Sequence, residues 1–155
     1  MPKRPESNGK CGVNVFGPRQ DPGSPYSAVI PLFLTAMLSG NAPQVFGDGL
    51  QSRDFTFVKN VVHGNLLAAD ADGAVGQTIN IADGRQTNLL QLIRLLNEQF
   101  GLNVKPDHLP ERPGDVRKSL ADISQARSIL AYEPQVDFEA GLRQSIEFYR
   151  SITSQ

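Results

Sequence analysis

The chain has 155 residues, and its 15 basic and 16 acidic side chains leave a formal charge of −1. This length is typical of about one domain, and the 39% apolar and 20% charged content is that of a globular protein. The near-neutral charge argues against nucleic-acid or membrane-surface binding, and no apolar run approaches the roughly 18 residues of a membrane span. A single cysteine, Cys11, excludes an internal disulfide and a cysteine-rich zinc site. We expect a cytoplasmic protein.

The first twelve residues differ in composition from the rest of the chain. They are polar, contain two prolines and two glycines, and show no hydrophobic periodicity. We therefore predict a disordered leader over residues 1–12 and one folded domain over residues 13–155.

The domain begins with a predicted strand and a predicted helix. The strand covers Val13–Phe16 and stops at the breaker Gly17, whereas the helix covers Ser27–Ser39 and stops at Gly40. The apolar residues at helical spacing are Val29, Leu32, Phe33, Ala36 and Met37.

The central part of the chain alternates between extended and helical patterns. We predict short extended segments over Gln44–Phe46 and Arg53–Val58, in the second of which Phe55 and Phe57 share a face. A helix is predicted over Lys59–Ala69, and the alternation of apolar and polar residues predicts a strand over Thr78–Ala82.

The C-terminal part is richer in helix. Thr87 or Asn88 is predicted to cap a helix that ends at Gly101, with Leu89, Leu92, Ile93, Leu96 and Phe100 on its apolar face. A further edge strand is predicted over Val104–Leu109.

Two more helices follow this edge strand. Asp122 and Gln125 have the spacing of a capping box for a helix over Ile123–Leu130, and Asp137 is predicted to cap a last helix. Short strands alternating with several helices indicate an α/β domain.

Residues of catalytic type are sparse. His63 and His108 stand alone in the sequence, so a structural role is favoured over metal binding. There is no Gly-x-Ser-x-Gly sequence, and the spacing of the early glycines fits neither a dinucleotide-binding turn nor a phosphate-binding loop. Cys11 lies in the predicted disordered leader and not at a helix terminus that would lower the pKa of its thiol, so we do not expect it to be a nucleophile.

Three segments carry a resemblance to a known family. They read NVFGPRQDP (Asn14–Pro22), VFGDGLQSRDFTFV (Val45–Val58) and RPGDVR followed by SLAD (Arg112–Asp122). Their order and spacing resemble the C-terminal half of the extended short-chain dehydrogenases/reductases, in the NAD-dependent nucleotide-sugar epimerase/dehydratase family. The likeness is greatest to the UDP-glucose and UDP-N-acetylglucosamine 4-epimerases, and it extends from Val13 to Arg150. It implies the substrate-binding half of such an enzyme, with the Rossmann half missing.

This resemblance also implies what the chain lacks. Enzymes of the family bind NAD through a Gly-x-x-Gly-x-x-Gly turn and use a Tyr-x-x-x-Lys pair as the catalytic base. Here the residues four positions after the tyrosines are Ile30, Val136 and Thr153, so the pair is absent. The family pattern also fails just upstream of Asn14, for which a truncated or rearranged gene is the simplest explanation. We expect no catalytic residue, no NAD bound by this chain alone and no activity alone.

The resemblance assigns several residues to the nucleoside diphosphate of a substrate. Arg53 and Arg112 match arginines that bind the diphosphate, and guanidinium groups suit phosphate oxygens. Asp115 matches the carboxylate that accepts the ribose hydroxyls, and Asn14 matches an asparagine at a strand end beside the diphosphate. The alternatives are a solvated arginine, a turn-forming aspartate and a loop amide.

Other matching positions concern the phosphate, the base and the sugar. Ala28 and Val29 start a helix whose backbone N–H groups could face phosphate. Val45 and Phe46 match a segment that lines the uracil, with a core role as the alternative. Ser119 matches a position beside the hexose C2 substituent, where a serine leaves room for an N-acetyl group that a tyrosine would exclude; the alternative is an ordinary loop serine.

The leading hypothesis is therefore the UDP-hexose or UDP-N-acetylhexosamine binding portion of a 4-epimerase. The alternatives are a non-enzymatic protein-interaction domain and one half of a split epimerase or dehydratase. Under the leading hypothesis, apolar surface that the missing half would cover is expected to promote self-association or binding of a partner, and the interaction domain would use the same surface to bind another chain. The choices between UDP and dTDP, and between epimerase, decarboxylase and dehydratase relatives, remain open.

Overall fold

The computed structural model describes residues 14–23 and 29–153 of the chain. The predicted leader, Cys11 and Ala28 lie outside these residues. The elements, in chain order, are β1 (Asn14–Phe16), α1 (Val29–Leu38), β2 (Gln44–Phe46), β3 (Ser52–Arg53), β4 (Phe55–Phe57), α2 (Val58–Asp70), the short 3-10 helix η1 (Asp72–Ala74), β5 (Thr87–Asn88), α3 (Leu89–Phe100), β6 (Asp107–Leu109), α4 (Ser124–Leu130) and α5 (Phe138–Thr153).

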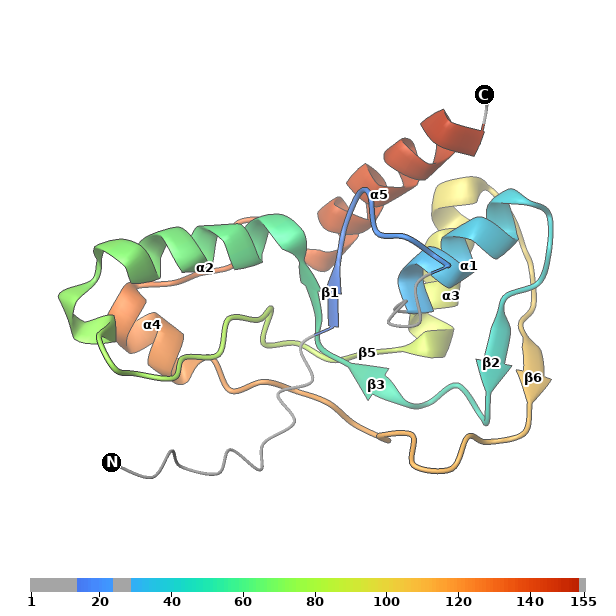
Figure 1. Cartoon of the computed structure of the whole chain (residues 1–155). Helices are drawn as coiled ribbons and strands as arrows, with labels where there is room; N and C mark the ends of the chain where they lie inside the picture. The colour runs from blue at the N-terminus through green and yellow to red at the C-terminus, as the bar shows by residue number, and fades with distance from the viewer. Residues whose placement is uncertain (1–13, 24–28, 154–155) are drawn as a thin grey trace.

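The strands form three two-stranded sheets rather than one continuous sheet. β1 pairs in parallel with β4 and β2 pairs in parallel with β6, while β3 and β5 are antiparallel. Figure 1 shows α1, α3, β2 and β6 at one end of the molecule and α2 with α4 at the other. The predicted α/β class with short strands and several helices is confirmed. None of the helices in the described part of the chain has the length and apolar character that a membrane crossing requires.

The larger hydrophobic cluster lies between α1, α3, α5 and the strands. Helix α5 contacts both α1 and β4, and the ring of Phe138 stacks on Phe55 with 5.5 Å between the centroids. The face predicted for α3 is confirmed, because Leu89, Leu92, Ile93 and Leu96 are buried and Phe100 packs against the cluster. The cap of this helix is Asn88, which forms a capping box with Gln91.

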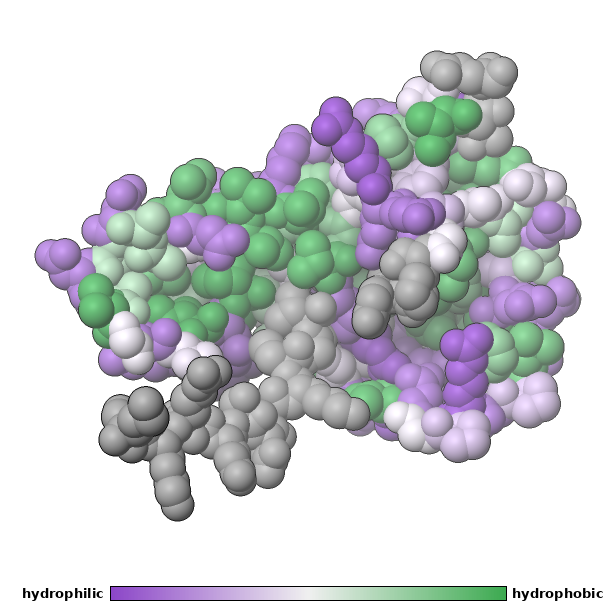
Figure 2. All heavy atoms as spheres, viewed as in Figure 1, coloured by the Kyte–Doolittle hydropathy of each residue, from purple (hydrophilic) through white to green (hydrophobic). Residues whose placement is uncertain are grey.

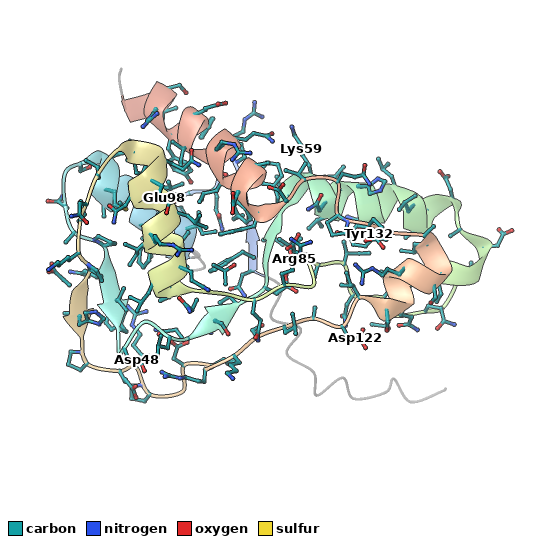
Figure 3. The ribbon with its side chains drawn as sticks, turned by 180° about the vertical axis from the view of Figure 1, so that it is seen from behind. Asp48, Lys59, Arg85, Glu98, Asp122 and Tyr132 are labelled. Atoms are coloured by element: carbon teal, nitrogen blue, oxygen red, sulfur yellow. The ribbon has the colours of Figure 1, made fainter. Side chains whose placement is uncertain are left out.

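A smaller hydrophobic cluster lies between α2 and α4. Its largest buried side chain is Tyr132, whose hydroxyl donates to the Ala82 carbonyl over 3.0 Å. Burial raises the pKa of the Tyr132 hydroxyl to about 12. Figure 3 shows Tyr132 beside α2, on the segment that leaves α4.

Asp54 connects the two parts of the molecule. Its buried carboxylate accepts from the backbone N–H groups of Asp83 at 3.1 Å, Gly84 at 3.0 Å and Ala121 at 3.4 Å. The Thr56 hydroxyl also donates to it, over 3.3 Å. One side chain between β3 and β4 therefore fixes two loops that lead toward α3 and α4.

Several local predictions were wrong. Thr78–Ala82 forms no strand: in the described chain it has no neighbouring strand to pair with, and Ile79 and Ile81 pack into the smaller cluster instead. Helix α4 starts at Ser124, so the Asp122 carboxylate accepts from Ser124 N–H and makes no capping box.

Other predictions needed smaller corrections. In α1, Leu32 is exposed, whereas Ile30 and Leu34 are buried. The alternation predicted for Arg53–Val58 is lost in β4, because Thr56 is buried together with the two phenylalanines beside it. The helix predicted at Lys59 begins one residue earlier, and the late edge strand shrinks to β6. Asp137 caps α5 as predicted, accepting from Ala140 N–H at 2.7 Å.

Candidate functional site

The candidate site is a cavity of about 430 Å³ between the large-cluster end of the fold and the loop before α4. We call it the arginine cleft. Its lining residues are Asn14, Val29, Leu32, Phe33, Gln44, Phe46, Gln51, Arg53, Leu89, Arg112, Pro113, Gly114 and Asp115. A volume of this size lies in the range of small-molecule and cofactor sites.

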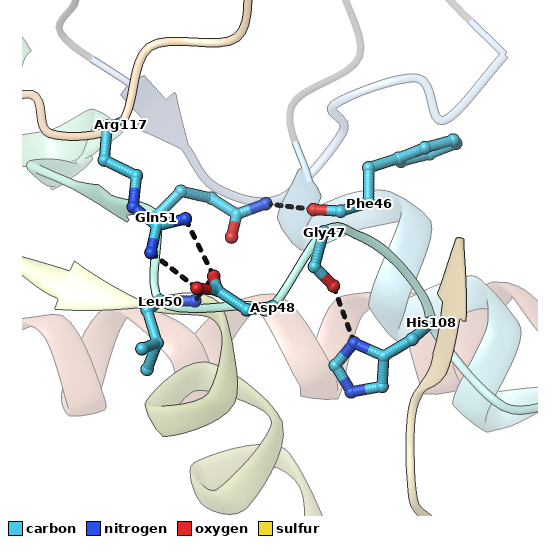
Figure 4. A network of polar contacts seen from close by, with 7 residues as sticks. All are labelled: Phe46, Gly47, Asp48, Leu50, Gln51, His108 and Arg117. Atoms are coloured by element: carbon cyan, nitrogen blue, oxygen red, sulfur yellow. Dashed lines mark hydrogen bonds and ion pairs between the residues drawn. The ribbon is translucent and has the colours of Figure 1, made fainter. Parts of the chain in front are cut away.

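A tight turn between β2 and β3 connects two residues that line the cleft, Phe46 and Gln51. Gly47 and Gly49 both have a positive φ, which glycine adopts without strain, and the Asp48 carboxylate accepts from Leu50 N–H at 2.9 Å. Figure 4 shows this turn. The Asp48 carboxylate also accepts hydrogen bonds from both terminal nitrogens of Arg117, and the Gly47 carbonyl accepts one from the His108 ring. The pairing with Arg117 lowers the pKa of Asp48. The turn thus joins β2 to the loop around residue 117.

The loop that carries Arg112 and Asp115 is held against β3. Ser52 N–H donates to the Arg117 carbonyl, and Ser119 N–H donates to the Ser52 carbonyl, both over 3.0 Å. At the tip of the loop Gly114 has a φ of +81°, and Asp115 N–H donates to the Arg112 carbonyl at 3.2 Å. Backbone pairing therefore places this loop beside Arg53.

Arg53 is the more buried of the two cleft arginines. Its Nη2 lies 2.6 Å from Asp115 Oδ1, and its Nη1 donates to the Ser52 carbonyl at 2.9 Å. Its side chain is 15% exposed, against 39% for that of Asp115. The antiparallel pairing of Arg53 with Thr87 fixes the backbone beneath it.

Arg112 stacks on an aromatic ring instead of pairing with a carboxylate. Its guanidinium carbon lies 3.6 Å from the centroid of the Phe46 ring, a close cation–π contact. Within residues 14–23 and 29–153, none of the ion pairs involves Arg112. The cleft therefore offers one guanidinium group held by a carboxylate and one free of such a partner.

Gln51 is a functional candidate that the sequence did not reveal. Its Nε2 donates to the Phe46 carbonyl at 2.6 Å, while its buried Oε1 has no hydrogen-bond partner among the residues that the structure describes. The side chain lines both the arginine cleft and an adjoining recess of about 60 Å³. A buried, unpaired acceptor at a cavity wall suits a ligand donor or a water molecule. No sequence pattern around Gln51 signals this burial.

The structure gathers most of the residues singled out from the sequence. Asn14, Val29, Phe46, Arg53, Arg112 and Asp115 all line the arginine cleft. The Val45 side chain is fully buried in the large cluster, and Ser119 is not part of the lining. Ala28 lies outside the described residues. Chemically, the cleft combines two cations, one carboxylate and an aromatic face, which is a set suited to binding a phosphorylated ligand.

Comparison with known proteins points to one family. A family model described as the NAD dependent epimerase/dehydratase family matches residues 11–82. The UDP-glucose 4-epimerase of Mycolicibacterium smegmatis is 36% identical over 139 residues, which make up 90% of this chain and 44% of that protein.

Solved structures give the same picture. A UDP-glucose 4-epimerase from Thermotoga maritima, crystallised with UDP-glucose, has a TM-score of 0.83 at 41% identity and covers 90% of this chain. A UDP-N-acetylglucosamine 4-epimerase from Methanobrevibacter ruminantium, in complex with UDP-N-acetylmuramic acid, has a TM-score of 0.81 at 41% identity over the same share. In each case this chain spans 44% of the relative, which is less than half of its length.

Proposed function

Because the chain is a partial member of the NAD dependent epimerase/dehydratase family, we propose that it binds a UDP-sugar in the arginine cleft. The observation that carries this proposal is the convergence of Arg53 and Arg112, from β3 and a distant loop, on one cavity that also contains Asp115. A diphosphate carries at least two negative charges and is bound best by guanidinium forks. The two relatives solved with UDP-sugars support this ligand class.

Each cleft residue then has a proposed role. Arg53 and Arg112 bind the diphosphate, Asp115 accepts hydrogen bonds from the ribose, and Phe46 contacts the base. Asn14 supplies a polar side chain at the end of β1, and Val29 belongs to the first turn of α1, whose backbone N–H groups are available to phosphate.

We propose that the 155-residue polypeptide alone does not perform the hydride chemistry of the family. Its residues do not fit NAD: the dinucleotide pyrophosphate needs a glycine-rich turn between a strand and a helix. β4 instead continues directly into α2, and β5 directly into α3, while Gly17 and Gly23, between β1 and α1, lack the Gly-x-Gly-x-x-Gly spacing. Since the sequence also lacks Tyr-x-x-x-Lys, its residues supply ligand binding and no base for catalysis.

Titration calorimetry with UDP tests this proposal. Loss of a charge-assisted contact in Arg53→Ala or Arg112→Ala is expected to weaken binding by about tenfold or more. Arg127→Ala is the matched control, because Arg127 lies on α4, pairs with Glu133 and does not line the cleft. Absence of saturable UDP binding, or unchanged binding in both cleft variants, would contradict the proposal. NAD-dependent turnover by the purified polypeptide would contradict its second part.

For the sugar, we propose the N-acetylhexosamine type on the basis of Ser119. A serine is small enough to leave space beside the hexose C2 position, and one of the similar structures is a UDP-N-acetylglucosamine 4-epimerase. Ser119→Tyr is expected to weaken binding of UDP-N-acetylglucosamine and to leave binding of UDP itself unchanged. Equal effects on both ligands would count against this choice.

A second candidate function is the binding of another protein chain, such as the remaining part of an epimerase fold. The supporting observation is an apolar stripe on the outer face of α2, formed by Val58, Val62 and Leu66 at four-residue spacing. Val62 is 52% exposed and Leu66 63%. Figure 2 shows the apolar surface gathered over this helix. Contiguous exposed apolar patches are typical of interaction surfaces.

Light scattering after size-exclusion chromatography tests this second function. Replacement of both Val62 and Leu66 by Asp is expected to abolish self-association or complex formation with a co-expressed Rossmann half. Val75→Asp is the control, because Val75 is 83% exposed and lies outside the stripe. A complex that survives the double substitution, or a wild-type chain that stays monomeric and binds no such half, would exclude the α2 stripe as an interface.

A further inference from the structure

A second cavity lies between the loop before β5, helix α3 and the start of α5. We call it the Asp83 cavity. It has a volume of about 360 Å³ and shares no lining residue with the arginine cleft. We propose that the Asp83 cavity binds an organic ammonium ion, with the Asp83 carboxylate as its anchor. This inference does not depend on the proposed binding of a UDP-sugar.

The Asp83 side chain is buried without a hydrogen-bond partner. The residue is 8% exposed, and its backbone N–H donates to the Asp54 carboxylate. Within residues 14–23 and 29–153, none of the hydrogen bonds or ion pairs involves the Asp83 carboxylate. Burial, followed by the charge of Asp54, raises the pKa of Asp83, so the ionised form is costly in the folded protein. A cation bound beside the carboxylate would reduce this cost.

The Asp83 carboxylate faces the cavity. After burial and Asp54, the charges that act on its pKa are those of Arg85, which lowers it, and Asp137, which raises it, and both of these residues line the cavity. The side-chain atoms that are both fully enclosed and unpartnered in the described structure are Gln20 Oε1 and Gln51 Oε1. The oxygens of Asp83 therefore keep access to the cavity, where a ligand can donate to them.

The other walls of the cavity favour an organic cation over a metal ion. Asp137 and Glu139, at the start of α5, add two exposed carboxylates, and the stacked rings of Phe55 and Phe138 line the same cavity. Aromatic rings and carboxylates together attract ammonium groups, which have three N–H donors and no acceptor. In the described part of the chain, no three Asp, Glu, His or Cys side chains lie close enough together to hold a metal ion.

Two arginines oppose this attraction. Three carboxylates and two guanidinium groups line the cavity, which leaves it a formal charge of −1. Arg94 pairs with Glu98 at 3.8 Å, whereas Arg85 is exposed and forms no ion pair with the described residues. Figure 3 shows Arg85 close to the start of α5. Removal of Arg85 is therefore expected to strengthen the binding of a cation and to weaken that of an anion.

Three four-carbon ligands of different charge, titrated into the full chain and followed by NMR, test the proposal. At one fixed ionic strength, putrescine is expected to cause saturable shifts of the Gly84, Arg85 and Glu139 amides, whereas butanediol and succinate are not. Asp83→Asn is expected to weaken putrescine binding about tenfold, the effect of one hydrogen bond between charged groups. Arg85→Ala is expected to tighten it several-fold. Asp70→Asn is the matched control, because Asp70 is exposed on α2 and does not line the cavity.

Several results would overturn the proposal. These are the absence of saturable shifts at Gly84 and Glu139, binding of succinate in place of putrescine, an affinity in Asp83→Asn equal to that of the control, and an affinity that does not rise in Arg85→Ala. Urea denaturation shows whether Asp83→Asn is folded, and the exposed Arg85 provides the deciding variant if it is not. Because UDP is absent from these titrations, this proposal and that of nucleotide binding succeed or fail separately.

Discussion

The two ends of this molecule use their side chains in opposite ways. Around the arginine cleft, charged residues from distant segments converge on a cavity and partly neutralise one another, as Arg53 and Asp115 do. At the α2–α4 end, the feature that stands out is instead an exposed apolar stripe on α2 that includes Val62 and Leu66. The contrast predicts that substitutions in the arginine cleft and substitutions on the α2 stripe have separate effects.

The largest expected effect comes from Asp54, which connects the two ends. Asp54→Ala removes the acceptor of the Gly84 and Ala121 N–H groups and weakens the hold on Asp83 N–H. Because each unsatisfied buried group costs about 1–3 kcal/mol, we expect the free energy of unfolding to fall by about 3 kcal/mol or more. Urea denaturation measures this, with Asp54→Asn as an intermediate variant. A loss below about 1 kcal/mol would show that the two ends are not coupled through Asp54.

A smaller effect, confined to the cleft end, is expected at the α3 cap. Asn88→Ala removes the capping box and should lower the free energy of unfolding by about 1 kcal/mol. Asp122→Ala is the comparison at the other end of the molecule, where the carboxylate accepts from Ser124 N–H without capping α4 in a box. Thermal denaturation that ranks Asp122→Ala as the more damaging variant would contradict the assignment of the caps.

The smallest expected effect is a pH dependence at the joint between the two ends. Burial, followed by the neighbouring charge of Asp54, raises the pKa of the Asp83 carboxyl above 3.8. The folded protein therefore binds this proton more tightly than the unfolded chain, so the stabilisation is present below pH 3.8 and is lost as the pH rises through the raised pKa.

Urea titrations between pH 4 and pH 7 measure this dependence. Asp83→Asn should remove the decline in stability with rising pH that this carboxyl causes. Asp122→Asn should not, because hydrogen bonds from Ser124 lower the pKa of Asp122. The stabilisation by Asp122 is therefore lost as the pH falls, not as it rises. An identical pH profile in Asp83→Asn and the wild-type chain would exclude this contribution of Asp83.

The sequence predicted the elements whose signals are local. Helix α3 has its cap, apolar face and terminating Gly101 within one continuous segment, and it formed as predicted. Asp137 likewise lies next to the N–H group that it caps. Such contacts depend on residues within one helical turn, so periodicity and capping rules are sufficient.

Pairings between distant segments could not be predicted in this way. The pattern of Thr78–Ala82 is that of a strand, but a strand requires a partner, and the described structure provides none there. The contact of β2 with β6 and the ion pair of Arg53 with Asp115 join residues about 60 positions apart. The cleft residues could be named only because three segments resembled a family, and Gln51, whose burial has no sequence signal, was missed.

Mapping backbone amide chemical shifts by NMR during a UDP titration tests the central claim most directly. The account predicts saturable changes at Phe46, Arg53 and the loop from Arg112 to Asp115, with Val62 and Leu66 on α2 unaffected. A titration with no saturable change, or with changes confined to α2, would contradict the assignment of nucleotide binding to the cleft end of the molecule.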